Sequence, residues 1–187
     1  VVSGPSGCGK TTLLNIIGGL DKYTVGDLVI NGVSTKQFTD RDWDVYRNHR
    51  IGFIFQSYNL IPHQTILENV ELASEIVQDA QDAAKALAAV GLGNRLHNFP
   101  AQLSGGEQQR VSIARAVAKN PKILLCDEPT GALDYKTGKQ VLQILQDMSR
   151  KQGATVIIVT HNSALAPIAD RVIRIHDARI QSVTLNE

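Results

Sequence analysis

The sequence lacks a long hydrophobic run, an excess of charge of either sign and any abundance of aromatic residues. No apolar stretch approaches the roughly 18 to 20 residues that a helix needs to span a bilayer, and no signal peptide is visible. The 19 lysines and arginines nearly balance the 18 aspartates and glutamates, so the net charge of +1 gives no reason to expect nucleic acid or anionic lipid as a partner. If a membrane matters here, another segment or another chain supplies the contact.

Cysteine and methionine are also scarce, and their positions carry information. Cys8 and Cys126 lie within segments that hold candidate catalytic residues, and we interpret them as small buried side chains in a reducing compartment, not as a disulfide. The single methionine is Met148 and the first residue is Val1, so we expect the chain to be a piece of a longer protein. Its 187 residues, 43% of them hydrophobic, suit one globular domain with a sizeable core.

The most informative segment is glycine-rich and begins three residues into the chain. Residues 4–11 read Gly-Pro-Ser-Gly-Cys-Gly-Lys-Thr, the pattern of a phosphate-binding loop whose backbone N–H groups converge on phosphate oxygens. Lys10 would place its charge near the β- and γ-phosphates, and the Thr11 hydroxyl would bind magnesium. The alternative is a glycine-rich turn before a helix. The residues that we expect to bind ATP are Gly4, Pro5, Ser6, Gly7, Cys8, Gly9, Lys10, Thr11 and Thr12.

A loop of this kind needs a strand before it to aim its backbone and a helix after it to supply a positive dipole. Only residues 1–3 remain of that strand, so we expect the front edge of the domain to be missing. Downstream, strand and helix patterns alternate, which favours an α/β architecture with a mainly parallel sheet. The predicted strands are 51–55, 123–126 and 155–160, the predicted helices include 65–77 and 79–90, and hairpins are predicted around Asn31-Gly32 and over 172–183.

Asp127 and Glu128 directly follow the apolar run 123–126. Two adjacent carboxylates at the end of a buried strand are hard to explain by packing, because unpaired buried charge is costly. Adjacent side chains on a strand point in different directions, so we assign Asp127 to magnesium and Glu128 to accepting a proton from the attacking water. The alternative is a solvated pair of acids. Together with the loop upstream, the pair is what a magnesium-dependent nucleoside triphosphatase requires.

Residues 103–110 read Leu-Ser-Gly-Gly-Glu-Gln-Gln-Arg, which is compatible with two roles. Ser104 and Glu107 form a capping box, worth about 1 kcal/mol, that predicts the start of a helix. A helix N-terminus that carries the bare Gly105 and Gly106 also presents free N–H groups and a positive dipole to an anion. In its place between a phosphate loop and an Asp-Glu strand, this run resembles the signature sequence of the ATP-binding-cassette (ABC) ATPases.

Other landmarks of that family follow in the same order. Gln56 matches the glutamine that, in this family, senses magnesium and the attacking water and contacts the transport partner. His161, directly after the run 155–160, matches the histidine that contacts the γ-phosphate. Residues 131–134, Gly-Ala-Leu-Asp, resemble the loop that communicates across a dimer, with Asp134 as its acidic residue. The other four histidines match no catalytic position.

The resemblance covers residues 1 to about 180 and implies a P-loop NTPase fold. A RecA-like core with a mainly parallel sheet would take up residues 1–56 and 121–187, with an inserted helical subdomain over about 57–120 and a small β-hairpin element. ATP and Mg²⁺ are the implied cofactors. The implied catalytic residues are Glu128, His161 and Gln56, and the implied magnesium ligands are Thr11, Gln56 and Asp127. The residues implied to bind the ATP of a partner cassette are Leu103, Ser104, Gly105, Gly106, Glu107 and Gln108.

Two departures from the family pattern limit what the resemblance implies. The aromatic residue that stacks on adenine lies upstream of the phosphate loop in this family and is absent here, so we expect the chain as it stands to bind ATP poorly. The stretch between Glu75 and Gly91 is also short for the subfamily. Neither departure touches the residues assigned to hydrolysis.

The resemblance also implies partners and a location. They are a second ABC ATPase domain in a head-to-tail homodimer and a membrane permease, separate or fused, at the cytoplasmic face of the cell membrane; no nucleic acid is expected. The runs 52–70 and 99–134 look most like the subfamily of lipoprotein release, macrolide efflux and antimicrobial-peptide export. Two alternatives stay open: a soluble cassette associated with ribosomes or DNA, and a non-transporting regulator of cell-division or cell-wall enzymes. The short spacing between Gln56 and Ser104 argues against the coiled-coil chromosome proteins, which separate these motifs by hundreds of residues.

Overall fold

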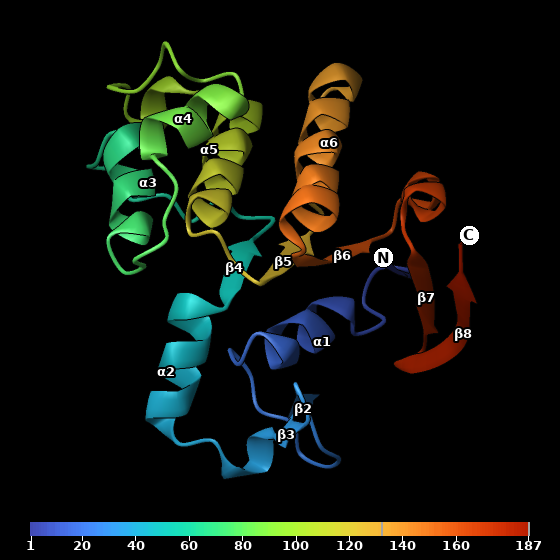
Figure 1. Cartoon of the computed structure of the whole chain (residues 1–187). Helices are drawn as coiled ribbons and strands as arrows, with labels where there is room; N and C mark the ends of the chain where they lie inside the picture. Colours follow the sequence, from blue (N-terminus) through green and yellow to red (C-terminus); the bar gives the residue numbers. More distant parts are fainter. Residues whose placement is uncertain (132, 187) are drawn as a thin grey trace.

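The structure, a computed structural model that describes residues 1–131 and 133–186, is built around a six-stranded sheet (Figure 1). Five neighbouring strands are parallel, and only the last one runs antiparallel to its neighbour. The α/β class with a mainly parallel sheet, predicted from the alternating patterns, is confirmed. In spatial order the strands are β4 (Ile51–Ile54), β5 (Ile123–Asp127), β6 (Thr155–Thr160), β1 (Val2–Ser3), β7 (Arg171–His176) and β8 (Arg179–Leu185).

The register of the parallel strands brings their carboxyl ends to one edge of the sheet. Ile54 lies opposite Cys126, Asp127 lies opposite Val159, and Ser3 lies opposite Thr160. Whatever follows β4, β5, β6 and β1 in the sequence therefore emerges at the same edge, the place where open α/β sheets bind their ligands.

Helices cover both faces of this sheet. Figure 1 shows α1 on one side of the strands and α6 on the other, and each packs against β6. The group formed by α3, α4 and α5 is inserted between β4 and β5, and its members pack on one another. The helices are α1 (Lys10–Ile17), α2 (Asp40–His49), α3 (Ile66–Ser74), α4 (Ala83–Ala89), α5 (Gly105–Ala118) and α6 (Tyr135–Gln152).

Shorter elements connect these parts. Asn31 and Gly32, both with positive φ, form the turn of the predicted hairpin, and the second predicted hairpin is the pair β7–β8. The remaining elements are β2 (Val29–Ile30), β3 (Val33–Ser34) and the 3₁₀ turns η1 (Thr35–Gln37), η2 (Pro100–Gln102) and η3 (Ser163–Ile168).

Side chains alternate along the central strands between two separate cores. Leu124 and Cys126 of β5 face the core that contains α5 and α6, whereas Leu125 faces the core that contains α1 and α2. In β6 the same alternation separates Ile158 from Val159. Strands buried on both faces explain the continuous apolar runs from which they were predicted.

The helix bounds differ from the prediction where local capping overrides periodicity. The segment predicted as 79–90 begins its helix at Ala83, because Asp82 accepts a hydrogen bond from the Lys85 N–H at 2.8 Å and caps it there. The sequence analysis did not predict α2. Its ten residues are mostly polar and Tyr46 is its only buried side chain, and the capping box of Thr39 and Asp42 that starts it was overlooked.

Candidate functional site

The phosphate loop links β1 to α1 and takes a shape that only glycines permit at two positions. Gly7 and Gly9 have φ angles of 77° and 93°, in the left-handed region. Gly4 has a different reason to be glycine, since a Cβ there would lie 2.1 Å from the backbone oxygen of Ile175. Gly9 is the N-cap of α1 and offers no side-chain cap, so the first N–H groups of this helix remain available to an anion.

Lys10 holds its ammonium group within this loop. Only 8% of the residue is exposed, and Nζ donates to the carbonyl oxygens of Gly4 at 2.8 Å and Pro5 at 2.7 Å. A third contact, 3.8 Å long, reaches the Sγ of Cys8. A positive charge and converging N–H groups therefore occupy one concave segment, which is the arrangement that binds phosphate.

Thr11 and Asp127, 116 positions apart, meet at the carboxyl edge of β5. The Thr11 hydroxyl donates to Asp127 Oδ2 at 3.0 Å. A hydroxyl and a carboxylate are oxygen ligands of the type that Mg²⁺ prefers, and this ion usually takes only one or two carboxylates and completes its shell with phosphate and water. Accordingly, the described residues contain no cluster of three His, Cys, Asp or Glu side chains suited to a metal. The pair therefore fits magnesium bound together with a phosphate ligand.

Gln56, the third predicted magnesium ligand, lies on a bend just after β4. Gln56 is exposed, and its side chain takes part in no hydrogen bond among the described residues. The structure thus joins Thr11 to Asp127 and places Gln56 at the same edge of the sheet without a hydrogen bond to either within the described residues.

Glu128 has an unusual backbone and a firmly held carboxylate. Its φ of +47° is rare for a residue with a long side chain and marks a local strain. Oε2 accepts from the Thr160 hydroxyl at 2.8 Å, while Oε1 accepts from the His161 N–H at 2.7 Å and contacts His161 Nδ1 at 2.6 Å. The Glu128 side chain is 13% exposed, against 65% for that of His161. The two neighbouring acids face different partners, and Glu128 lies just beyond the end of β5 at Asp127.

Thr160 is a contact of this site that the sequence analysis missed. It is the last residue of β6 and only 1% exposed. The available signal was its position directly before His161, following the apolar residues 156–159. A hydroxyl at the end of a buried strand needs a partner, and that partner is Glu128.

The predicted signature segment forms the start of α5. The Ser104 hydroxyl accepts from the Glu107 N–H at 3.3 Å, and Glu107 Oε2 accepts from the Ser104 N–H at 2.8 Å, so the predicted capping box is present. The hydrogen bond from the Ser104 backbone lowers the pKa of the Glu107 carboxyl. Ser104 and Gly105 are exposed. Among the described residues, no hydrogen bond or ion pair joins 103–108 to 4–12.

Asp134 also acts as a helix cap. Its Oδ1 accepts from the Thr137 N–H at 3.0 Å at the start of α6, and hydrogen bonds from the side chain and the backbone of Thr137 lower the pKa of its carboxyl. Of the predicted communication loop, Ala132 lies outside the described residues.

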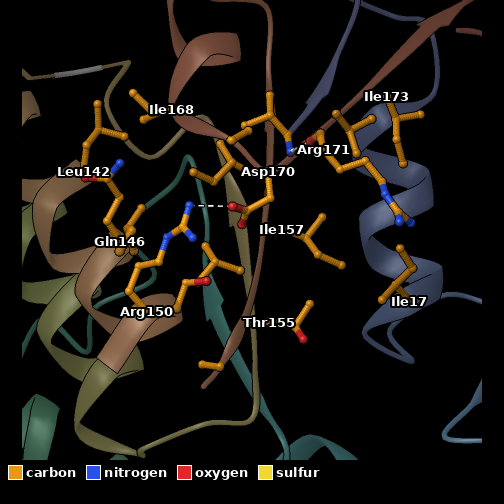
Figure 2. A pocket seen from close by; sticks show the side chains of 18 of the residues that line it. Ile17, Leu142, Gln146, Arg150, Thr155, Ile157, Ile168, Asp170, Arg171 and Ile173 are labelled. Carbon is orange, nitrogen blue, oxygen red and sulfur yellow. Dashed lines mark hydrogen bonds and ion pairs between the residues drawn. The ribbon is translucent and has the colours of Figure 1, made fainter. Parts of the chain in front are cut away.

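A cavity of about 480 Å³ opens between α1, α6 and the strands β1, β6 and β7 (Figure 2). Its lining is mostly aliphatic, including Ile17, Leu142, Ile157 and Ile173. The lining also holds polar side chains, among them the ion pair between Arg150 and Asp170. None of the predicted site residues lines this cavity, so it is separate from the phosphate loop and the carboxylate pair.

Comparisons with known proteins agree with this geometry. Residues 1–131 match the family described as ABC transporter. An uncharacterised ABC transporter ATP-binding protein of Mycobacterium tuberculosis is 47% identical over 182 residues, which cover 95% of this chain and 73% of that protein. The macrolide export ATP-binding/permease protein MacB of Rhodopirellula baltica is 44% identical over 184 residues, 95% of this chain and 27% of MacB.

A solved structure extends the similarity to the fold. The ATP-binding cassette MJ0796, a protein of Methanocaldococcus jannaschii, was solved as a dimer in a post-hydrolysis state bound to ADP and phosphate. It superimposes with a TM-score of 0.91 at 42% sequence identity, and the match covers 98% of this chain and 83% of that one.

Proposed function

The chain belongs to the ABC transporter family and is an ATP-binding subunit of that family, and on this premise we propose that its hydrolysis of ATP is magnesium-dependent and drives a membrane permease. One observation carries the proposal. The phosphate loop, the Thr11–Asp127 pair and the Glu128–His161 pair all lie at the carboxyl edge of the parallel strands.

Residues 4–12 would bind the phosphates of ATP. The Lys10 ammonium, held by loop carbonyls, neutralises phosphate charge, and the uncapped first turn of α1 donates N–H groups. We assign the phosphate-binding core to residues 1–56 and 121–187, and the helical subdomain that carries the signature to about 57–120.

Thr11 and Asp127 would hold Mg²⁺, with Gln56 as the third ligand. When bound, the ion neutralises charge on the β- and γ-phosphates. Glu128 accepts a proton from water as the water oxygen bonds to the γ-phosphorus, while the bond to the β-phosphate oxygen breaks and ADP leaves. His161 holds Oε1 of this base, and its exposed ring would contact the γ-phosphate.

The signature segment, residues 103–108, would bind the ATP held by the phosphate loop of a second copy of the cassette. Residues 103–108 make no polar contact with residues 4–12 of the same chain, and the similar cassette MJ0796 was solved as a dimer. In a head-to-tail homodimer, the free N–H groups at the start of α5 would bind the γ-phosphate held by the partner's loop, and Asp134 would lie near the contact. ATP then joins the two copies, and hydrolysis releases them, because only the γ-phosphate distinguishes the closed state from the open one.

The permease would supply the transmembrane part. None of the helices within 1–131 and 133–186 has both the length and the apolar character of a bilayer span. The similarity to MacB, whose name describes a macrolide export ATP-binding/permease protein, favours an exporter of the cell envelope and a place at the cytoplasmic face of the membrane. The segment from Gln56 to Asn69 would then contact the permease.

The test is Glu128→Gln, which keeps the shape of the side chain and removes the base. We expect the turnover of ATP to fall by about 100- to 10,000-fold, while ATP binding persists and a dimer accumulates. Glu71→Gln, an exposed glutamate of α3, is the matched control and should hydrolyse ATP at the parental rate. Parental turnover in Glu128→Gln would refute the assignment of the base.

A further inference from the structure

We propose that Thr160 is a positioning residue for hydrolysis, because its buried hydroxyl fixes the orientation of the Glu128 carboxylate. The inference rests on the proposed function, in which Glu128 is the base. It concerns a residue that touches no part of the phosphate loop through a side-chain hydrogen bond and acts only through another side chain.

The hydrogen-bond pattern determines where the Thr160 proton points. Thr160 Oγ1 accepts the N–H of Asn162 at 3.0 Å, and an N–H group cannot accept in return. The other hydrogen bond of this hydroxyl among the described residues is to Glu128 Oε2, at 2.8 Å. The hydroxyl is therefore committed as a donor to this one carboxylate oxygen.

The two oxygens of Glu128 are held unequally. Oε1 contacts both the backbone N–H and the ring Nδ1 of His161, whereas within 1–131 and 133–186 the hydrogen-bond partner of Oε2 is Thr160. Oε2 therefore keeps acceptor capacity for a water molecule, and the Thr160 bond sets the direction of its remaining lone pair. Without this bond the carboxylate is held through Oε1 alone, by His161, and the direction of Oε2 has no hydrogen bond of its own to fix it.

Packing alone does not explain a threonine at this position. Thr160 is the last residue of the central strand β6. Ser3 of β1 lies directly opposite it, and Asp127 of β5 lies opposite the preceding residue, Val159. Valine has the same branched shape and would fill this 1% exposed space without a polar group to satisfy. The hydroxyl adds only its two hydrogen bonds, one of which reaches the base.

The first experiment measures kcat and KM for ATP in Thr160→Val and Thr160→Ser, with thermal unfolding as a check of folding. We expect Thr160→Val to lower kcat by about 10- to 100-fold while KM stays near the parental value, since a misdirected base affects the reaction and not the binding of ATP. Thr160→Ser retains the hydroxyl and should recover most of the rate. If Thr160→Val does not fold, Thr160→Ala against Thr160→Ser poses the same question with two smaller side chains.

The second experiment places Thr160→Val in the Glu128→Gln background. A residue that acts through the carboxylate should lower kcat no further once the base is gone, whereas an independent role predicts that the two losses multiply. Multiplying losses, a parental kcat in Thr160→Val or a failure of serine to recover the rate would each overturn the proposal. A parental rate in Glu128→Gln alone would instead overturn the proposed base, so the two failures are distinguishable.

Discussion

Arg115 makes a contact whose removal tests how the signature helix is joined to the segment after Gln56. From the last turn of α5, its Nη1 donates to the Asn59 carbonyl at 2.6 Å and its Nη2 donates to the Tyr58 carbonyl at 3.0 Å. Burial of the guanidinium lowers its pKa. The same segment packs on the other end of α5, where a Cβ on Gly105 would lie 2.9 Å from the Tyr58 hydroxyl oxygen.

The size of the effect follows from these two bonds. A hydrogen bond from a charged donor contributes about 1.5 to 3 kcal/mol. Because Asn59 is exposed, its carbonyl regains water when the guanidinium is removed, so we expect Arg115→Ala to lower the free energy of unfolding by about 2 to 4 kcal/mol rather than by the full sum. Asn59 also has a left-handed φ of 49°, a conformation that has less support once the bond is lost.

Urea unfolding of Arg115→Ala measures this change, and Arg95→Ala is the control. Arg95 is also an arginine of the inserted region, but its ion pair with Glu107 is 3.7 Å long and its side chain is 44% exposed. Such a surface pair contributes about 0 to 1 kcal/mol. If the free energy of unfolding falls by equally small amounts in the two variants, Arg115 does not hold the segment after Gln56.

Two further predictions concern the phosphate loop and the signature helix. In Gly4→Ala the new Cβ would meet the backbone oxygen of Ile175, which cannot move aside as a side chain can. We therefore expect thermal unfolding to show a free energy of unfolding lower by about 1 to 3 kcal/mol, together with weaker binding of ATP. Gly138→Ala, inside α6 with only ordinary contacts, should instead leave the free energy of unfolding unchanged or raise it. Destabilisation of both variants would contradict this reasoning. The folded-state pKa of Glu107 is lowered, so its ionised form stabilises the fold above its ordinary pKa of 4.5, and that contribution is lost as the pH falls through the lower folded value. The melting temperatures of the protein and of Glu107→Gln should therefore differ most near neutral pH and converge in acid, and a difference that does not depend on pH would refute this.

Much of the fold could be predicted because its signals are local. The capping boxes at Thr65 and Ser104 and the hairpin turn at Asn31 each depend on residues no more than three positions apart. The buried strands could be predicted because both of their faces are apolar. The helix α2 was missed although the capping box of Thr39 and Asp42 at its start is an equally local signal. Its segment does not show that Tyr46 is buried against α1, where its hydroxyl donates to the Ile17 carbonyl at 3.0 Å and burial raises its pKa to about 12.

The sequence by itself determined the family of this protein and the identity of its candidate site residues, because the phosphate loop, the signature and the Asp-Glu pair are each short runs of neighbouring residues. Only the tertiary structure decided how those residues meet. The hydrogen bond from Thr11 to Asp127, the hold of Thr160 and His161 on Glu128, and the reason for a glycine at position 4 all join segments that are far apart in the chain. Strand register sets these contacts, and register is a property of the assembled sheet and not of any one segment.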